Sequence, residues 1–486
     1  MIDFDNTYAR LPEKFYARQR PTPVTRPELI AWNDSLASDL RLDLEGIGPE
    51  ELAGVFAGNT LPDGSDPLAM AYAGHQFGQF VPQLGDGRAI LLGEVLDQDG
   101  VRRDIQLKGA GRTPFSRAGD GRAWIGPVIR EHLVSEAMHT LGIPTTRSLA
   151  SVATGEAVYR ETRLPGAVLT RVATSHLRIG TFEYFAARGD VEALRRLTQY
   201  AIDRHHPPLN EASDPPLALL EAVIDSQAVL VAKWMHVGFI HGVMNTDNMA
   251  LSGETIDYGP CAFLDYYDPE MAFSSIDAYG RYAFGNQSRI AQWNLARLAE
   301  ALLMAGSGEN EQRHQHAESL IRSFPDRFDK QWLHGMRRKL GLHRPHDTDV
   351  ELIDDLLAMM RESEVDYTVC FRALCDAAED NQQPWLALFD DREKPKAWLK
   401  QWRDRCQQEE AVGDRASSMR QVNPAVIPRN HRIEQVIQAA VLDGDLSPME
   451  RLQEALKRPF EEQEHLTEYM LPPAPAERVR ATFCGT

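Results

Sequence analysis

The stretch that decides the fold is His241-Gly242-Val243-Met244-Asn245-Thr246-Asp247-Asn248, followed nine residues after its last member by Asp257-Tyr258-Gly259. Mg²⁺ that bridges nucleotide phosphates is commonly held by an amide oxygen and a carboxylate from neighbouring turns of the chain. Asn248 and Asp257 supply these two groups. The sequence therefore predicts a metal-dependent nucleotide site at this point.

The eight-residue string has the length and the ends of the catalytic loop of protein kinases, H-R-D-L-x-x-x-N, and Asp257-Tyr258-Gly259 stands where kinases have Asp-Phe-Gly. The position of the kinase catalytic aspartate is occupied by Val243, which cannot accept a proton. Asp247 is the only carboxylate in the loop and is the candidate general base. The alternatives are a catalytically dead kinase or, for so short a motif, an ordinary hairpin with polar ends.

Strand and turn signals upstream predict a three-stranded antiparallel meander. Its strands are expected at 76–84, 89–96 and 101–108. Apolar residues at i+4 spacing predict a helix over 127–141. Further strands are expected at 149–154 and 167–172.

Lys108 ends the third strand of this meander, and Glu131 lies 23 residues later on the predicted helix. A lysine–glutamate pair in these places orients the ammonium group onto phosphate oxygens. Glu136, about a turn and a half further along the helix, is the alternative partner. The order Lys108, Glu131, Asn248, Asp257 is more specific than any one of these residues alone.

Two glycine-containing loops and two arginines complete the candidate nucleotide site. Gly85-Asp86-Gly87-Arg88 connects the first two strands, and the segment 109–122 follows the third. Residues 101–130 hold seven Lys or Arg and two Asp, a local charge of +5 in a chain of net charge −19. Such a basic segment suits a polyanion as small as a nucleoside triphosphate. Arg171 and Arg178 carry guanidinium groups suited to phosphate, although arginines at this spacing are ordinarily surface residues.

The chain has 486 residues, of which 43% are apolar and 25% charged, as in ordinary globular proteins. The net charge of −19 argues against a nucleic-acid partner. We expect no membrane partner, because no run reaches about 18 uncharged apolar residues. Acidic residues at the start, where a targeting peptide carries bases, and a sparse, odd set of five cysteines favour the cytoplasm. Cys484 near the end is either inert or a reversible redox latch.

The order of these elements predicts an α+β fold with the two-lobed arrangement of protein kinases. We expect an N-terminal arm over 1–70 with one helix near 26–39, and a β-rich N-lobe over 71–165. A mainly helical C-lobe with the catalytic loop should cover 166–300. This lobe should include a long helix over 217–236 and a hairpin turning at 252–254. A helical extension and a cysteine tail should cover 301–486, with a capping box from Ser447 to Glu450.

Several long strings carry a resemblance to a known family. They are YAGHQFGQF, LGDGR, LKGAGRTPFSRAGDGRA, HGVMNTDNM, IDYGP, GRYAFGNQ and WNLARLA, and they run from about Tyr72 to Ala299. The chain resembles the selenoprotein O family, whose bacterial members are called YdiU. The resemblance implies a pseudokinase that binds ATP in a flipped orientation. It implies transfer of AMP to Ser, Thr or Tyr hydroxyls of protein substrates, with release of pyrophosphate.

The resemblance also implies a role for each matching residue. Asp247 would be the proton acceptor, and Asn248 and Asp257 the ligands of Mg²⁺, with Mn²⁺ as a possible substitute. Lys108 with Glu131 would contact the phosphates, and Arg171 and Arg178 the inverted end of the triphosphate. The nucleotide pocket would be lined by Gly85, Gly87, Arg88, Asp120 and Gly121. A latch disulfide of Cys484 would need a partner thiol, and Cys261 is the cysteine near the segment where the family has one.

Three other activities remain open at this point. UMP transfer from UTP is a close variant, because nothing in the sequence selects the base. A true kinase would transfer the γ-phosphoryl group instead. A non-catalytic nucleotide sensor is the third alternative, which Val243 favours and the intact Lys108, Asn248 and Asp257 oppose.

Overall fold

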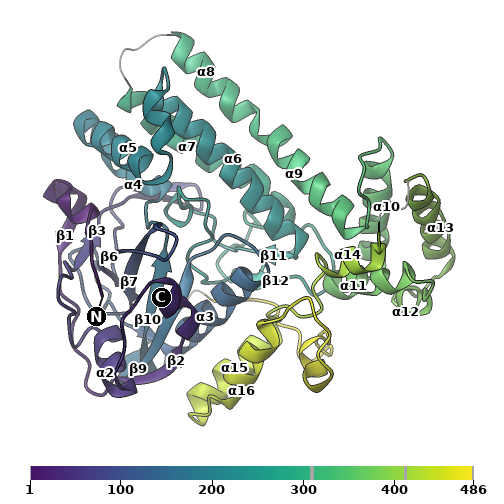
Figure 1. Cartoon of the computed structure of the whole chain (residues 1–486), viewed down its shortest axis with the longest axis horizontal. Helices are drawn as coiled ribbons and strands as arrows, with labels where there is room; N and C mark the ends of the chain where they lie inside the picture. The colour runs from purple at the N-terminus through teal and green to yellow at the C-terminus, as the bar shows by residue number, and fades with distance from the viewer. Residues whose placement is uncertain (1, 307–310, 410–412, 484–486) are drawn as a thin grey trace.

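The central sheet positions the candidate site, and its middle strands are β6 (Ala89–Leu96), β7 (Arg102–Lys108) and β10 (Arg163–Ala173). The computed structural model describes residues 2–306, 311–409 and 413–483 (Figure 1). The described strands run in the order β1-β3-β6-β7-β10-β9-β2, with β8 paired to β10, and every pairing is antiparallel. The outer strands and the short strand are β1 (Tyr16–Arg18), β2 (Glu28–Trp32), β3 (Leu68–Met70), β8 (Ala123–Trp124) and β9 (Arg147–Tyr159).

Two of the three predicted meander strands are confirmed, and the first is wrong. β6 and β7 pair in the register Ala89↔Lys108, so Lys108 ends its strand as expected. The partner on the other side of β6 is β3, whereas the predicted first strand forms a separate hairpin. This hairpin consists of β4 (Gly74–Gln76) and β5 (Gln79–Val81). Phe77 and Gly78 have φ of 51° and 82°, a pair of left-handed residues that turns the chain back within two residues.

The first 70 residues supply three strands of the same sheet. The predicted helix near 26–39 is correct only in its second half, α1 (Asp34–Asp39), because 28–32 pairs with β9 as strand β2. α1 and α2 (Pro49–Phe56) pack on one face of the sheet and enclose an apolar core with Ile105, Leu107 and Val168.

The opposite face of the sheet is covered by α3 (Ile125–Thr140), which confirms the predicted helix over 127–141. α3 is buried nearly all round, because helices from the C-terminal end pack against its other side. These helices are α15 (Asn430–Leu442) and α16 (Ser447–Leu456). Thr140 Oγ1 donates a hydrogen bond to Leu456 O at 2.8 Å, which joins the ends of α3 and α16. Figure 1 shows α15 and α16 beside α3.

A helical layer follows the sheet, and the catalytic loop lies within it. Its elements are α4 (Ile179–Ala186), α5 (Val191–His205), α6 (Pro215–His236), β11 (Phe239–Ile240), a short 3₁₀ turn (Thr246–Asn248), β12 (Ala262–Phe263) and α7 (Gln287–Ala305). β11 pairs with β12 across the loop. The expected hairpin turning at 252–254 is wrong, because Ala250 bridges to Arg178 and Thr255 bridges to Thr145 instead of to each other.

Among the described residues, α6 is the one helix whose length and composition would allow it to cross a membrane. Within its most apolar window, 56% of the residues are buried inside the protein, and α6 packs against α7 and α9 (Phe324–Lys339). This burial is typical of the core helix of a globular protein.

A second apolar core surrounds Trp385, Trp398 and Trp402. The helices that form it are α9 (Phe324–Lys339), α10 (Asp349–Glu362), α11 (Tyr367–Ala377), α12 (Gln383–Leu386), α13 (Glu393–Gln407) and α14 (Arg415–Arg420). The preceding helix, α8 (Glu311–Arg322), packs against α6 and α7 instead. The expected capping box at α16 is wrong: Ser447 is the first helical residue, and its backbone N–H donates to Asp445 Oδ1 at 2.9 Å. The chain is thus an α+β protein, and Cys484 lies outside the described residues.

Candidate active site

Three cations and two carboxylates meet where the sheet, α3 and the segment after the catalytic loop come together. Lys108 Nζ donates to Glu131 Oε2 and to Asp257 Oδ1, each at 2.6 Å. Arg171 Nε donates to Glu131 Oε1 at 2.8 Å, and its Nη2 donates to Asp257 Oδ1 at 2.6 Å. Arg178 approaches Asp257 Oδ2 at 3.7 Å. We call these five residues the charge cluster.

The elements explain why the charge cluster forms. Lys108 ends β7 beside Leu169 of β10, which brings Arg171 close to it on the neighbouring strand. Glu131 extends from α3 beneath the sheet, so it is the predicted partner that the structure pairs with Lys108. The alternative, Glu136, accepts hydrogen bonds from Arg147 instead, at 2.8 and 2.9 Å. The two predicted arginines are buried, not surface residues.

Net positive charge surrounds both carboxylates of the charge cluster. Burial alone would raise the pKa of Asp257, but Arg171, Lys108 and Arg178 outweigh it and hold that pKa well below its usual range. Burial likewise opposes ionisation of Glu131, and the charges of Arg171 and Lys108 still lower its pKa. Asp257 has φ of 64°, a left-handed conformation that is uncommon for aspartate and common at functional sites. Asp86 lies 3.6 Å from Arg178 as well, so the three cations and their carboxylates form one connected group of buried ion pairs.

Asp247, the candidate base, lies in the 3₁₀ turn next to the charge cluster. Gln76 Nε2 donates to Asp247 Oδ2 at 3.2 Å, whereas Oδ1 is buried and has no hydrogen-bond partner among the described residues. Burial raises the pKa of Asp247 to about 7. A carboxylate with such a pKa can accept a proton near neutral pH and release it again.

The predicted metal ligands leave oxygen atoms available. Among the described residues, no three or more His, Cys, Asp or Glu side chains gather into a metal-binding group. Asn248 Nδ2 donates to Val243 O at 2.9 Å, which directs its amide oxygen elsewhere. Asp257 gives Oδ1 to Lys108 and Arg171 and keeps Oδ2 at ion-pair distance from Arg178. Asn248 and Asp257 therefore fit a cation that takes its other ligands from phosphates and water, as Mg²⁺ usually does.

The glycine-containing loops pack against each other beside the charge cluster. A Cβ on Gly85 would lie 2.3 Å from the ring of Phe115, and one on Gly87 would lie 3.0 Å from Phe115 O. Arg88 O accepts a hydrogen bond from Gly109 N at 2.7 Å, next to Lys108. These contacts place the first loop against the second.

Asp120 and Gly121 lie outside the charge cluster, on the second loop. Asp120 forms an ion pair with Arg160 at 2.8 Å, and its side chain is 44% exposed. A Cβ on Gly121, whose φ is 71°, would lie 2.1 Å from Gly111 O, so glycine is needed where the loop closes. The structure thus leaves the predicted nucleotide contacts of Asp120 and Gly121 as predictions.

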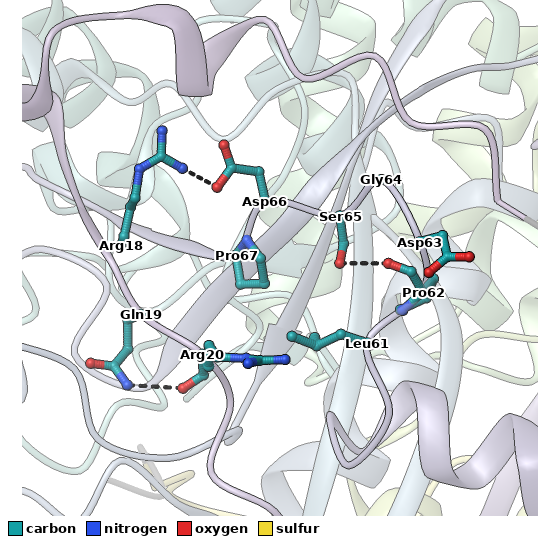
Figure 2. A pocket seen from close by; sticks show the side chains of 10 residues that line it. All are labelled: Arg18, Gln19, Arg20, Leu61, Pro62, Asp63, Gly64, Ser65, Asp66 and Pro67. Carbon is teal, nitrogen blue, oxygen red and sulfur yellow. Dashed lines mark hydrogen bonds and ion pairs between the residues drawn. The ribbon is translucent and has the colours of Figure 1, made fainter.

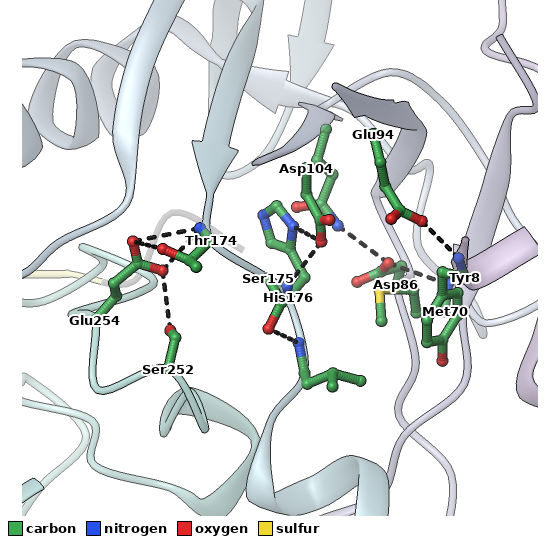
Figure 3. A network of polar contacts seen from close by, with 12 residues as sticks. Tyr8, Met70, Asp86, Glu94, Asp104, Thr174, Ser175, His176, Ser252 and Glu254 are labelled. Atoms are coloured by element: carbon green, nitrogen blue, oxygen red, sulfur yellow. Dashed lines mark hydrogen bonds and ion pairs between the residues drawn. The ribbon is translucent and has the colours of Figure 1, made fainter. Parts of the chain in front are cut away.

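Asp86 and Tyr72 are site residues that the sequence analysis missed. Asp86 is buried, accepts from Met70 N and Gln106 Nε2 at 3.1 Å each, and lies 3.6 Å from Arg178 (Figure 3). The Arg178 guanidinium lies 4.4 Å from the centre of the Tyr72 ring. Asp86 belongs to the string LGDGR, in which Gly85, Gly87 and Arg88 were given roles, and Tyr72 begins the string YAGHQFGQF. The sequence signal that could have identified Asp86 is a charged residue between two glycines.

A second buried network links the sheet to the helical layer near the charge cluster. Asp104 Oδ2 accepts from His176 N at 2.8 Å and lies 3.0 Å from His176 Nδ1, while Glu254 accepts from Thr174 and Ser252 (Figure 3). Arg204 of α5 contacts both Glu94 and Asp104. These contacts fix the segment 174–178 that leads to Arg178.

A surface hollow of about 470 Å³ lies away from this site, lined by residues 18–20 and 61–67 (Figure 2). Arg18 forms an ion pair with Asp66 across it. None of the predicted site residues lines it, so it does not bear on the chemistry of the charge cluster.

Comparisons with known proteins identify the family of the chain. The family model described as "Protein adenylyltransferase SelO" matches residues 1–457. A relative from Rhizobium etli (strain CIAT 652), named "Protein nucleotidyltransferase YdiU", is 58% identical over 99% of this chain and 97% of its own. A relative of the same name from Agrobacterium fabrum is 56% identical over the full length of both chains. The names of the family model and of these relatives describe a class of enzymes that transfer nucleotidyl groups to proteins. The chain belongs to the SelO family, also called YdiU.

Proposed function

We propose that this enzyme transfers AMP from ATP to Ser, Thr or Tyr hydroxyls of protein substrates, with release of pyrophosphate and with help from a divalent metal ion. The observation that carries the proposal is the charge cluster with Asp247 beside it. The cluster contains three cations that could bind phosphates, and Asp247 is a candidate base at a position of the loop different from that of the kinase base. Membership of the SelO family supports the same reaction.

We also propose that the fold has the two lobes of a protein kinase. The sheet with α3 corresponds to the N-lobe, and α4 to α7 with the catalytic loop correspond to the C-lobe. The ion pair of Lys108 on a strand with Glu131 on the next helix, at 2.6 Å, supports this assignment. Asp257 at the junction of the two parts supports it further.

We propose an orientation of the bound triphosphate from the burial of the three cations of the charge cluster. Arg171 and Arg178 are each 2% exposed, deeper than Lys108 at 12%. The outer phosphates carry the most negative charge, so we place them on these buried cations. The innermost phosphorus then faces the catalytic loop, which is the inverted arrangement. In this orientation the loss of the usual kinase base at Val243 does not prevent reaction.

The residues of the chain divide the remaining work. The Asp247 carboxylate accepts the proton of the acceptor hydroxyl, and the hydroxyl oxygen forms a bond to the α-phosphorus as the bond to pyrophosphate breaks. Asn248 and Asp257 would hold Mg²⁺ or Mn²⁺, which supplies charge neutralisation to the phosphates when bound. Lys108, Arg171 and Arg178 bind and orient the phosphates and the departing pyrophosphate.

UMP transfer from UTP is the second candidate, because the relatives are named for nucleotidyl transfer with no base specified. A non-catalytic sensor would need neither a buried base nor the complete charge cluster, so the geometry favours an enzyme. The net charge of −19 supports proteins rather than nucleic acids or anionic membranes as partners. Location in the cytoplasm and function without a membrane partner are also part of this proposal.

Incubation with ATP that is labelled at either the α- or the γ-phosphorus tests the proposal. We expect protein to gain label from the α position and none from the γ position, and to gain it far more slowly when Asp247 is replaced. Label that enters protein only from the γ position would show a kinase. UTP in competition with ATP separates the two nucleotidyl transfers.

A further inference from the structure

The hairpin β4–β5 lies directly against the catalytic loop, and three consecutive hairpin residues bind it. His75 N donates to Thr246 Oγ1 at 2.7 Å, Gln76 Nε2 donates to Asp247 Oδ2 at 3.2 Å, and Phe77 N donates to Asn245 Oδ1 at 3.1 Å. The hairpin is not part of the central sheet. Its contacts with the catalytic loop therefore hold it in place.

A buried carboxylate ties the hairpin and the loop together from behind. Glu183 of α4 contacts His75 Nδ1 with one oxygen and accepts a hydrogen bond from Thr246 Oγ1 with the other. The Glu183 side chain is 5% exposed. The ring of His75 packs edge-on to Trp293 of α7, with centroids 5.1 Å apart. His75 therefore supports the loop and has no contact with the charge cluster among the described interactions.

Space around the candidate base is closed on the hairpin side. A Cβ on Gly74 would lie 2.4 Å from Asp247 Oδ1, and a Cβ on Gly180 would lie 2.1 Å from Ala73 O. Glycine at both positions lets the hairpin, the start of α4 and the loop approach this closely. Asp247 therefore has Oδ1 against Gly74 and Oδ2 on the Gln76 amide, so both oxygens of its carboxylate contact the hairpin.

We infer that Gln76 is a positioning residue for the proposed base, and that the β4–β5 hairpin is the element that orients Asp247. The Gln76 amide holds Oδ2 and Gly74 closes the space at Oδ1, so the hairpin fixes the plane of the carboxylate that takes the proton of the acceptor hydroxyl. The contacts of His75 and Glu183 with Thr246 fix the backbone that carries Asp247. The inference rests on the proposed function, because it assigns Gln76 a part in the step that Asp247 performs.

Gln79 offers a matched control on the same hairpin. It lies directly opposite Gln76 in the antiparallel pair and is exposed to solvent. Gln76→Met and Gln79→Met make the same chemical change, from an amide to an unbranched apolar side chain of similar length, on opposite strands. A general effect of the substitution on the hairpin would appear in both variants.

The test compares kcat for transfer, Kd for the nucleotide and the thermal midpoint of wild type, Gln76→Met and Gln79→Met. A lost hydrogen bond to a charged group predicts that Gln76→Met lowers kcat about tenfold or more, with Kd and the midpoint unchanged. Gln79→Met should match wild type in all three. Wild-type kcat in Gln76→Met would overturn the inference, and so would equal losses in the two variants.

A second comparison shows whether Gln76 acts through Asp247. In an Asp247→Asn background, Gln76→Met should cause no further loss, because the group that it orients is gone. A full additional tenfold loss there would overturn the inference. Transfer of the γ-phosphoryl group by wild type would instead defeat the proposed function. The inference about Gln76 could then be tested by the rate of that transfer, because either transfer deprotonates the acceptor hydroxyl.

Discussion

The guanidinium of Arg171 lies 2.6 Å from Asp257 Oδ1, although the two residues are 86 positions apart in the chain. One comes from a strand of the central sheet and the other from the segment after the catalytic loop. This ion pair therefore fixes the two sides of the candidate site relative to each other before any nucleotide binds.

The Arg171 contact should also stabilise the fold. Arg171 is 2% exposed and balances two carboxylates, so Arg171→Met leaves Glu131 and Asp257 with Lys108 as their close partner. Loss of one member of a buried ion network predicts a decrease of about 3–5 kcal/mol in the free energy of unfolding. Urea denaturation of wild type and variant measures this decrease in the free energy of unfolding. Arg160→Met, which removes the ion-pair partner of the 44% exposed Asp120, should cost less than about 1 kcal/mol. Equal losses in the two variants would contradict the account.

Asp257→Ala should abolish nucleotide binding that depends on a divalent metal ion. The substitution removes a proposed metal ligand and also releases Lys108 and Arg171 from their shared carboxylate oxygen. Calorimetric titration with ATP in the presence and absence of Mg²⁺ checks this result. Unchanged metal-dependent affinity would exclude Asp257 as a ligand.

Asp247→Ala should separate binding from chemistry. The side chain has no ion pair with the charge cluster, so affinity for ATP with Mg²⁺ should stay near that of wild type. Loss of a general base predicts a decrease in the transfer rate of about 10²–10⁴. Single-turnover kinetics with labelled ATP gives the rate, and an Asp247→Ala protein of wild-type activity would remove this residue from the mechanism.

His132 should make the protein less stable in mild acid. It is buried in α3 with Nδ1 2.9 Å from Ser151 Oγ, and burial lowers its pKa to about 4. The unfolded chain, with a histidine pKa near 6.5, binds a proton that the folded chain excludes. Stability is therefore complete above about pH 6.5 and falls as pH decreases toward 4, by at most about 3 kcal/mol from this residue.

Urea denaturation of wild type and His132→Asn at about pH 7 and about pH 4.5 tests the histidine prediction. Other buried histidines remain in both proteins, so the difference between their pH dependences isolates His132. The variant should lose less stability on acidification than wild type. A steeper loss in the variant would mean that the buried imidazole is protonated in the native protein.

Elements with strong periodicity could be predicted from the sequence. β6, β7, α3 and α6 follow from alternation or from helical spacing together with glycine and proline at their ends. Residues 28–32 could not, because pairing with β9, over 100 residues away, makes them a strand. The capping box failed for a local reason: Asp445 binds the backbone of Ser447 and the helix begins one residue earlier than the motif requires.

The charge cluster was predictable in composition because Lys108, Glu131 and Asp257 each end or occupy a recognisable element. The roles of Asp86 and Gln76 were not predictable in this way. Their function depends on burial and on partners that lie 92 and 171 positions further along the chain, Arg178 and Asp247, which no local pattern reveals. Motif reasoning selected the flexible glycines around Asp86, whereas the structure shows that the charged residue between them contacts the arginine.

The inverted triphosphate is the central claim, and a crystal structure of the enzyme with Mg²⁺ and a non-hydrolysable ATP analogue tests it most directly. We predict that the outermost phosphate lies on Arg171 and Arg178, and that the α-phosphorus faces the Asp247 carboxylate. An analogue bound with its γ-phosphorus toward Asp247, and its innermost phosphate on the two arginines, would contradict the account.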